Sequence, residues 1–246
     1  MADPMDTAKI VTVAPGVFVR ESVDTMGWID MGEYGIAVDA LEQRELEGEV
    51  FAVLAETLGE KPIRFVLNTH THYDHVALNS AFERRFGARI VNQATGAIDP
   101  EGRWFEGNRR VLIKPMPDCH TPEDCIVWVP DGKVLFVGDI FGWGLIPLTS
   151  ALTDTTAELL VETYARLIDY GADVVVPGHG PVCTTAELER WVRYFQWLRE
   201  AAARGRSEGK SDHQMIKALS PPEDMKHWWR FRQWKHEDSV SKTLKR

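Results

Sequence analysis

A cluster of metal-binding residue types directly after one buried strand constrains this chain more than any other feature. The apolar stretch 63–67 predicts a buried strand, and it runs into His70, His72, Asp74 and His75. Imidazole and carboxylate groups are the ligands that borderline divalent metal ions prefer. His70 and His72 lie two residues apart in an extended loop and can reach one ion, whereas Asp74 and His75 can turn toward a second. The cluster therefore predicts a metal site at the end of a β-strand.

Three further ligand-type residues also stand at the ends of apolar stretches. His120 lies in the turn-rich loop after 111–113, Asp139 ends the strand 134–138, and His179 ends the strand 174–178. In layered α/β folds the loops that follow the strands converge, and ligands bind there. Glycines before Asp139 and on both sides of His179 allow a sharp turn or a close approach of the backbone. Seven such residues at four strand ends indicate a metal centre.

The order of the elements predicts a mixed α/β layered domain. Short apolar runs separated by glycine turns indicate a strand meander up to residue 38. Helical spacing and alternating apolar runs then predict helices over 42–58, 76–86, 154–170 and 184–203, with strands over 63–67, 89–91, 126–129, 134–137 and 174–176 between them. Two shorter helices, over 211–219 and 222–234, are expected at the C-terminal end.

The ligand pattern resembles that of the metallo-β-lactamase superfamily over roughly residues 10–195. It consists of H-x-H-x-D-H at 70–75, then His120, Asp139 within F-V-G-D, and His179 within P-G-H-G. The resemblance implies an αββα sandwich of two mixed β-sheets flanked by helices, with the metal site at one edge. We expect a catalytic domain over 1–200 and a C-terminal helical extension over 201–246 packed on it. The resemblance also assigns ligands to two ions, with Asp139 bridging: His70, His72 and His120 to one, and Asp74, His75 and His179 to the other.

The expected function is that of a dinuclear metal-dependent hydrolase, with Zn²⁺ as the first choice of cofactor and Mn or Fe as alternatives. A hydroxide bridging two divalent ions would attack a carboxylic thioester, ester or lactone, and Asp74 would orient it and carry a proton to the leaving group. The metal site as a whole resembles that of glyoxalase II-like and lactonase-like members. By the same resemblance, an aspartate at 139 points toward thioesterase-, lactonase- or phosphodiesterase-like members and away from dedicated β-lactamases, many of which lack it. The alternatives are a β-lactam or phosphodiester hydrolase and a mononuclear iron persulfide dioxygenase of the same fold.

The residues around His120 and three aromatic residues near the candidate ligands lead to further expectations. Cys119 precedes His120, where many family members have glycine, and we interpret it as a packed thiol. The pair 123–124 that follows is interpreted as part of a turn or as a support for the ligands. Three aromatic residues beside glycine turns, Trp28, Phe141 and Trp143, are expected to line the substrate cleft. An aromatic rim suits an acyl or aryl group.

Charge and composition limit the partners. The chain carries 37 acidic against 28 basic residues, a net charge of −9, which argues against a general nucleic-acid binder. No stretch approaches the roughly 18–20 apolar residues of a membrane span, no secretory signal is visible, and three cysteines are too few for a disulfide framework. We therefore expect a cytoplasmic protein with a small-molecule substrate and no nucleic-acid or membrane partner. From Arg199 onward 12 basic and 7 acidic residues give +5, and this tail is expected to dock on the acidic body or to join a homo-oligomer.

Overall fold

Two β-sheets lie face to face in the computed structural model, which describes residues 7–116, 118–142, 154–226 and 232–245. The first sheet has six strands in chain order. Its first four strands form an antiparallel meander, and the last two are added in parallel. The strands are β1 (Lys9–Ala14), β2 (Val17–Glu21), β3 (Met26–Asp30), β4 (Gly35–Val38), β5 (Ile63–Leu67) and β6 (Arg89–Val91).

The second sheet has five strands in the order β11-β10-β9-β8-β7. Only β10 and β11 run parallel, because α4 (Asp154–Asp169) separates them in the sequence. Both sheets are therefore mixed. The other strands are antiparallel neighbours. The bounds are β7 (Arg103–Glu106), β8 (Arg110–Pro115), β9 (Cys125–Val129), β10 (Val134–Gly142) and β11 (Val174–His179).

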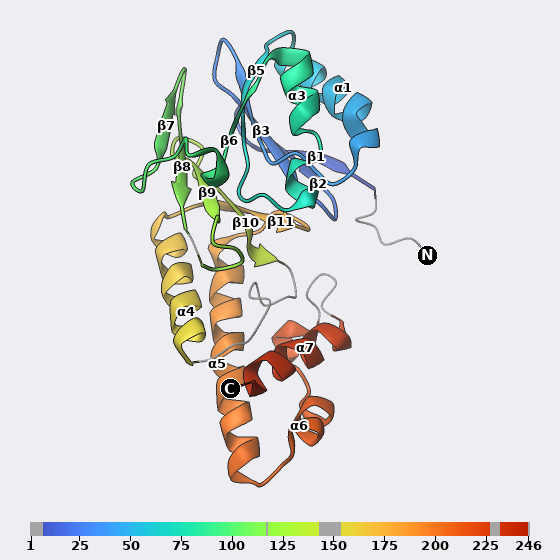
Figure 1. The fold of residues 1–246 in the computed structure, drawn as a ribbon, viewed down its shortest axis with the longest axis vertical. Helices are drawn as coiled ribbons and strands as arrows, with labels where there is room; N and C mark the ends of the chain where they lie inside the picture. Colours follow the sequence, from blue (N-terminus) through green and yellow to red (C-terminus); the bar gives the residue numbers. More distant parts are fainter. Residues whose placement is uncertain (1–6, 117, 143–153, 227–231, 246) are drawn as a thin grey trace.

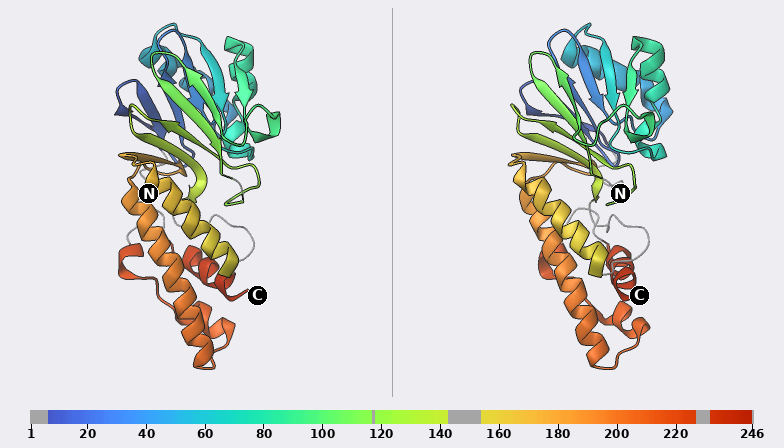
Figure 2. Two further views of the ribbon diagram at one scale, coloured as in Figure 1. Left: turned by 90° about the vertical axis from the view of Figure 1, so that its left-hand side faces the viewer. Right: turned by 60° about the vertical axis from the view of Figure 1, so that its left-hand side comes forward.

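Three hydrophobic cores lie between the four layers of the fold, which are two sheets and a layer of helices on either side. One core lies between the two sheets and includes Val19 and Phe136. A second lies between the first sheet and the helices α1 (Glu47–Leu58) and α3 (Asn79–Phe86). The third joins the second sheet to α4 and α5 (Thr185–Ser207). Figures 1 and 2 show this order of layers, and the predicted αββα sandwich is confirmed.

The C-terminal helices pack on the half of α5 that extends beyond the sheets (Figures 1 and 2). They are α6 (Asp212–Ala218) and α7 (Gln233–Leu244), with a 3₁₀ turn η4 (Glu223–Met225) between them. A Cβ on Gly205 of α5 would lie 2.3 Å from Sδ of Met215, so glycine permits the close approach of α6. The domain boundary expected between residues 200 and 201 falls inside α5, and the extension therefore begins as the continuation of a helix of the sandwich.

The last predicted helix differs from the structure. Residues 227–231 of the predicted helix over 222–234 lie outside the described residues. Before them η4 ends at Met225, and after them α7 begins only at Gln233. The buried face of α7 includes the polar residues His236, Ser239 and Thr243. The spacing of apolar residues alone therefore does not locate this helix. In the described part of the chain, no helix is long and apolar enough to cross a membrane.

Candidate metal centre

The structure brings all seven predicted ligands together at one edge of the sandwich. Four follow β5: two in the loop after it and two in the short helix α2 (Tyr73–Val76). The other three come from the second sheet, in the loop from β8 to β9, within β10, and at the end of β11. Their side-chain nitrogen and oxygen atoms form three overlapping groups, each within 4.8 Å: His70, His72 and His120; His70, His75 and Asp139; Asp74, His75 and His179.

The first group consists of three imidazoles. Nε2 of His120 lies 3.0 Å from Nδ1 of His72, and the rings of His70 and His72 meet edge to face with centroids 4.6 Å apart. His70 is buried, and burial, together with the neighbouring His75, lowers its pKa to about 3. His70 is therefore neutral at physiological pH, which is the state that binds a metal ion.

The group formed by Asp74, His75 and His179 contains one carboxylate and two imidazoles. Nε2 of His179 lies 3.4 Å from Oδ2 of Asp74, and Nε2 of His75 lies 4.0 Å from Oδ1 of Asp74. Burial raises the pKa of Asp74, but the hydrogen bond from His179 and the charges of both histidines lower it overall. Asp74 is therefore a carboxylate at neutral pH.

Asp139 lies between this group and the group of three imidazoles, His70, His72 and His120. Its Oδ1 lies 3.3 Å from Nε2 of His75, while its Oδ2 lies 3.3 Å from Nε2 of His179 and 3.5 Å from Nε2 of His120. Burial raises the pKa of Asp139, but His179 and His75 outweigh burial and hold it well below the usual value. Oδ2 thus lies near an imidazole of each group, and an ionised carboxylate in this position has the placement that a bridging ligand needs.

Three buried polar atoms at the centre of this cluster test whether the residues suit a metal ion. They are Nε2 of His70, Nε2 of His75 and Oδ1 of Asp139. None makes a hydrogen bond among the described residues, although Nε2 of His75 and Oδ1 of Asp139 lie 3.3 Å apart. A buried polar atom without a partner costs about 1–3 kcal/mol, so three converging atoms of this kind are unusual in a purely structural site. A cation between them would satisfy all three. The nitrogen and oxygen donor set suits Zn²⁺, Mn²⁺ or Fe²⁺.

The carboxylates of this cluster favour positive charge on the neighbouring imidazoles. Burial lowers the pKa of His75, but the carboxylates of Asp39 and Asp139 outweigh it and raise the value to about 10. Burial likewise lowers the pKa of His179, which the hydrogen bond and charge of Asp139 raise well above its usual value. The carboxylates thus create a site for positive charge, and metal binding there would release protons.

Asp39 is a supporting residue that the sequence did not reveal. It follows β4 with φ of 60°, is 4% exposed, and its Oδ2 lies 3.1 Å from Nδ1 of His75. Its Oδ1 accepts a hydrogen bond of 2.8 Å from the backbone N–H of Thr69. A hydrogen bond to one ring nitrogen fixes the tautomer and presents the other nitrogen as a ligand. The only sequence signal was a single aspartate after an apolar strand, which by itself names no partner.

The turn at 22–25 supports His179 in the same way. Nδ1 of His179 lies 2.9 Å from the carbonyl oxygen of Val23 and 3.2 Å from Oδ1 of Asp24. These acceptors hold the ring so that Nε2 faces Asp74 and Asp139. The sequence did not indicate this contact, because the turn lies about 155 residues from His179.

Two glycines allow β10 and β11 to approach closely around Asp139. Gly138 has φ of +51°, and β10 shifts its register against β11 at this point, so Asp139 lies within β10 rather than at its end. A Cβ on Gly178 would lie 2.0 Å from Oδ1 of Asp139. The predicted role of these glycines in a close backbone approach is confirmed.

The loop around His120 has the predicted turn. Asp124 is buried and accepts hydrogen bonds from the backbone N–H groups of His120, at 2.6 Å, and Thr121, at 2.9 Å. Cys119 is also buried, with Sγ 3.5 Å from Oγ1 of Thr163. The burial of Cys119 confirms its interpretation as a packed thiol, and burial also raises the pKa of the thiol to about 11.

The predicted aromatic lining of the substrate cleft is not found. Trp28 is 1% exposed, packs against α1, and donates from Nε1 to Oγ1 of Thr57 at 2.9 Å. Phe141 is fully buried in the core that includes α4. These two predictions are therefore wrong, and Trp143 lies outside the described residues. The exposed aromatic residue beside the cluster is Tyr73, which is 70% exposed and directly precedes Asp74.

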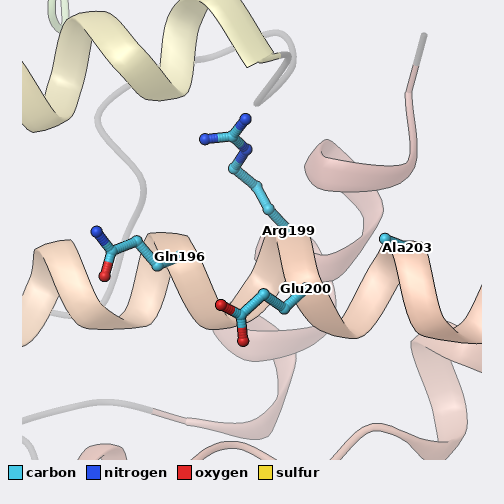
Figure 3. Close-up of a pocket in the computed structure, with 4 residues that line it drawn as sticks. All are labelled: Gln196, Arg199, Glu200 and Ala203. Carbon is cyan, nitrogen blue, oxygen red and sulfur yellow. The ribbon is translucent and has the colours of Figure 1, made fainter.

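Cavities occur both near the cluster and far from it. A cavity of about 340 Å³ runs along α5 and contains none of the predicted ligands. Figure 3 shows its lining on α5, with Arg199 extending away from the helix axis. Another cavity, of about 520 Å³, is lined in part by Val23 and Asp24, which contact His179.

The family model of the metallo-beta-lactamase superfamily matches residues 35–118 and 98–179, which include every predicted ligand. The chain belongs to the metallo-β-lactamase superfamily. A metallo-beta-lactamase type 2 of Pseudomonas aeruginosa is 25% identical over 219 residues, covering 78% of this chain and 87% of that relative. These matches agree with the geometry of a superfamily metal site.

Solved structures show the same fold. A metallo-beta-lactamase from Pontibacter korlensis has a TM-score of 0.62 and 20% identity, covering 77% of this chain and 99% of its own. A stereoselective inverting sec-alkylsulfatase from a Pseudomonas species has a TM-score of 0.70 and 14% identity. That match covers 96% of this chain but 50% of the alkylsulfatase, so this superfamily member spans half the length of that structure.

Proposed function

We propose that this chain is a dinuclear metal-dependent hydrolase of carboxylic thioesters, esters or lactones, with Zn²⁺ as its metal and Mn or Fe as alternatives. The observation that carries the proposal is the position of Asp139, whose two carboxylate oxygens lie within 3.5 Å of imidazoles from both ligand groups. A mononuclear site would leave one of these groups without a function.

The residues divide into two ligand sets around Asp139. His70, His72 and His120 would hold one ion, and Asp74, His75 and His179 the other. Two bound divalent ions would lower the pKa of a water molecule toward neutrality and polarise the carbonyl oxygen under attack. Asp39 and Asp24 hold the imidazoles of His75 and His179 in place through the ring nitrogens that face away from the cluster.

Asp74 is the residue to which we assign proton movement. It is an ionised carboxylate next to His179 and is only partly buried, so it can accept a proton from water and pass it to a leaving group. The chemistry requires no nucleophilic serine or cysteine. Burial also raises the pKa of the Cys125 thiol, to about 12, and so keeps it from acting as a nucleophile.

Hydrolysis of β-lactams is a second candidate, because a relative named as a metallo-beta-lactamase is 25% identical over most of the chain. Against it stands Asp139, because the family resemblance associates an aspartate at this position with thioesterase-, lactonase- or phosphodiesterase-like members rather than with dedicated β-lactamases. Phosphodiester hydrolysis and persulfide oxygenation at a single iron are the remaining alternatives.

Metal analysis together with a substrate panel tests the proposal. The purified chain is loaded with Zn²⁺, Mn²⁺ or Fe²⁺, its metal content is measured, and the same samples are assayed with thioesters, lactones, β-lactams, phosphodiesters and a persulfide. We expect close to two ions per chain and the highest kcat/KM on a thioester, ester or lactone. Full activity at one ion per chain would contradict the dinuclear site, and turnover of only a β-lactam, a phosphodiester or the persulfide would contradict the substrate class.

A further inference from the structure

Hydrogen bonds connect the turn at 22–25, in the first sheet, to the end of β11 in the second sheet, next to the candidate metal centre. The backbone N–H of Gly180 donates to the carbonyl of Ser22 at 3.1 Å, and that of Thr25 donates to the carbonyl of Gly178 at 2.9 Å. The hydroxyl of Thr25 is buried and donates to the carbonyl of Gly180 at 3.1 Å. These contacts surround His179 on both sides, so the position of the turn determines the position of that ligand.

The same turn borders the cavity of about 520 Å³ described above. Two of its lining residues, Asp24 and Val23, contact Nδ1 of His179. Other lining residues come from the loop that leads into α1, with Leu41 and Leu46, and from Ala8, which directly precedes β1. A molecule in this cavity would therefore touch residues that contact His179 directly.

The charges of the lining favour some ligands over others. Nε of Arg20 lies 2.9 Å from Oε1 of Glu49, so its guanidinium is already paired. Asp24 adds a second carboxylate, and the lining therefore holds two carboxylates against one guanidinium. Apolar side chains at Leu41 and Leu46 complete it. Such a lining accepts an apolar stem that carries N–H donors and disfavours a carboxylate or a phosphate.

We infer that this cavity binds the end of the substrate that is remote from the cleaved bond, which we call the substrate tail. This tail carries N–H groups as an amide or an ammonium. Asp24 is a positioning residue that contacts both the tail and His179. The inference rests on the proposed hydrolase function and extends it to a feature of the substrate remote from the bond that is cleaved. The two sources of the N–H group differ in charge, so the experiment can separate them.

A series of thioesters with one acyl group and tails of equal length tests the chemistry of the cavity. The tails end in methyl, carboxamide, ammonium or carboxylate. We expect kcat/KM for the carboxamide or the ammonium to exceed that for the methyl tail by about tenfold, the scale of one hydrogen bond to a charged group. The carboxylate tail should be the poorest. Equal kcat/KM for all four tails would overturn the inference.

Two variants on the same edge of the first sheet locate the effect. Ala8→Trp fills the cavity from its rim, and Ile10→Trp places the same side chain at a position that is 38% exposed and outside the lining. We expect Ala8→Trp to raise KM for the preferred tail about tenfold, with kcat and KM for the methyl tail unchanged. Ile10→Trp should behave like the wild type. If both variants behave alike, the cavity does not bind the tail.

Asp24 is tested by metal content as well as by turnover. Asp24→Asn keeps an oxygen acceptor for Nδ1 of His179 and removes the charge, whereas Asp24→Ala removes both. We expect Asp24→Asn to retain two ions and lose the preference for ammonium, and Asp24→Ala also to bind its second ion more weakly, by about tenfold or more. Unchanged metal binding and tail preference in both variants would overturn the role of Asp24.

A binding measurement separates this inference from the proposed function. A non-hydrolysable thioether that ends in the preferred group is titrated calorimetrically into the metal-loaded wild type and into Ala8→Trp. Binding that is lost in Ala8→Trp supports the cavity even if no thioester is cleaved, in which case only the hydrolase proposal fails. Thioester cleavage combined with equal binding to both proteins contradicts the cavity alone.

Discussion

Oδ2 of Asp39 lies 3.1 Å from Nδ1 of His75, so this buried carboxylate holds the imidazole whose other nitrogen is 3.3 Å from Asp139. Removing the carboxylate leaves the ring free to rotate and its tautomer undefined. We expect Asp39→Ala to weaken metal binding about 10–100-fold. Competition with a chromophoric chelator measures the change, and Asp39→Asn, which keeps an acceptor, should lose less. Equal affinity in Asp39→Ala and the wild type would contradict this support.

Asp139 is expected to affect both ions because it contacts both ligand groups. Asp139→Ala should lower the metal content from near two ions toward one and reduce turnover in the same samples. The control is Glu106→Ala, which removes an exposed carboxylate at the far edge of the second sheet. A variant of Asp139 that keeps two ions and full turnover would show that its position is not a bridging one.

A substitution of Asp74 is expected to lower catalysis more than metal binding. Asp74→Asn keeps the shape and a carbonyl oxygen but loses the charge and the ability to carry a proton. We expect kcat to fall at least about a hundredfold, the usual scale for the loss of general acid–base help, while part of the metal is retained. Metal content and kcat are measured on one preparation. Turnover close to that of the wild type with two ions bound would refute the role of Asp74.

Gly178 should not accept even a methyl group. A Cβ there would lie 2.0 Å from Oδ1 of Asp139 and 2.9 Å from the backbone of Gly138, so the carboxylate or the strand must move. We expect Gly178→Ala to reduce metal affinity and kcat together. The matched control is Gly142→Ala on the neighbouring strand β10, because a Cβ there meets no atom of the described residues within 4 Å. Similar losses in both variants would point to a general effect of alanine on these strands.

The buried His236 on α7 is expected to make the free energy of unfolding depend on pH. It is fully buried, with Nδ1 2.7 Å from the hydroxyl of Tyr194 and Nε2 2.9 Å from the carbonyl oxygen of Leu219. Burial lowers the pKa of His236, so the unfolded chain binds more protons than the folded one between that lowered value and the unfolded value of about 6.5. The free energy of unfolding should therefore fall as pH falls through this window.

Urea denaturation at pH 7.5 and 5.5 measures this effect. His236→Gln removes the titrating group and should show a smaller difference between the two pH values, although it is less stable at pH 7.5. His213→Gln serves as the matched control, because it makes the same substitution at an exposed position of α6. An equal pH dependence in His236→Gln and the wild type would contradict the assignment.

The sequence by itself determined the ligand set and the type of fold. Metal coordination demands particular side chains, and these stand at the ends of apolar strands whose periodicity is local, so residues 70–75, His120, Asp139 and His179 were recognisable without coordinates. The family pattern then implied the two mixed sheets that the structure contains.

Only the tertiary structure decided what supports the ligands and what covers them. Asp39 and Asp24 act on histidines 36 and 155 residues away, and a contact of that range leaves no periodic signal in the chain. Trp28 was expected at the substrate cleft, but α1 covers its face of the first sheet and buries it. Which face of a strand is covered depends on where a distant helix packs, and α7, with its partly polar buried face, was misplaced for the same reason.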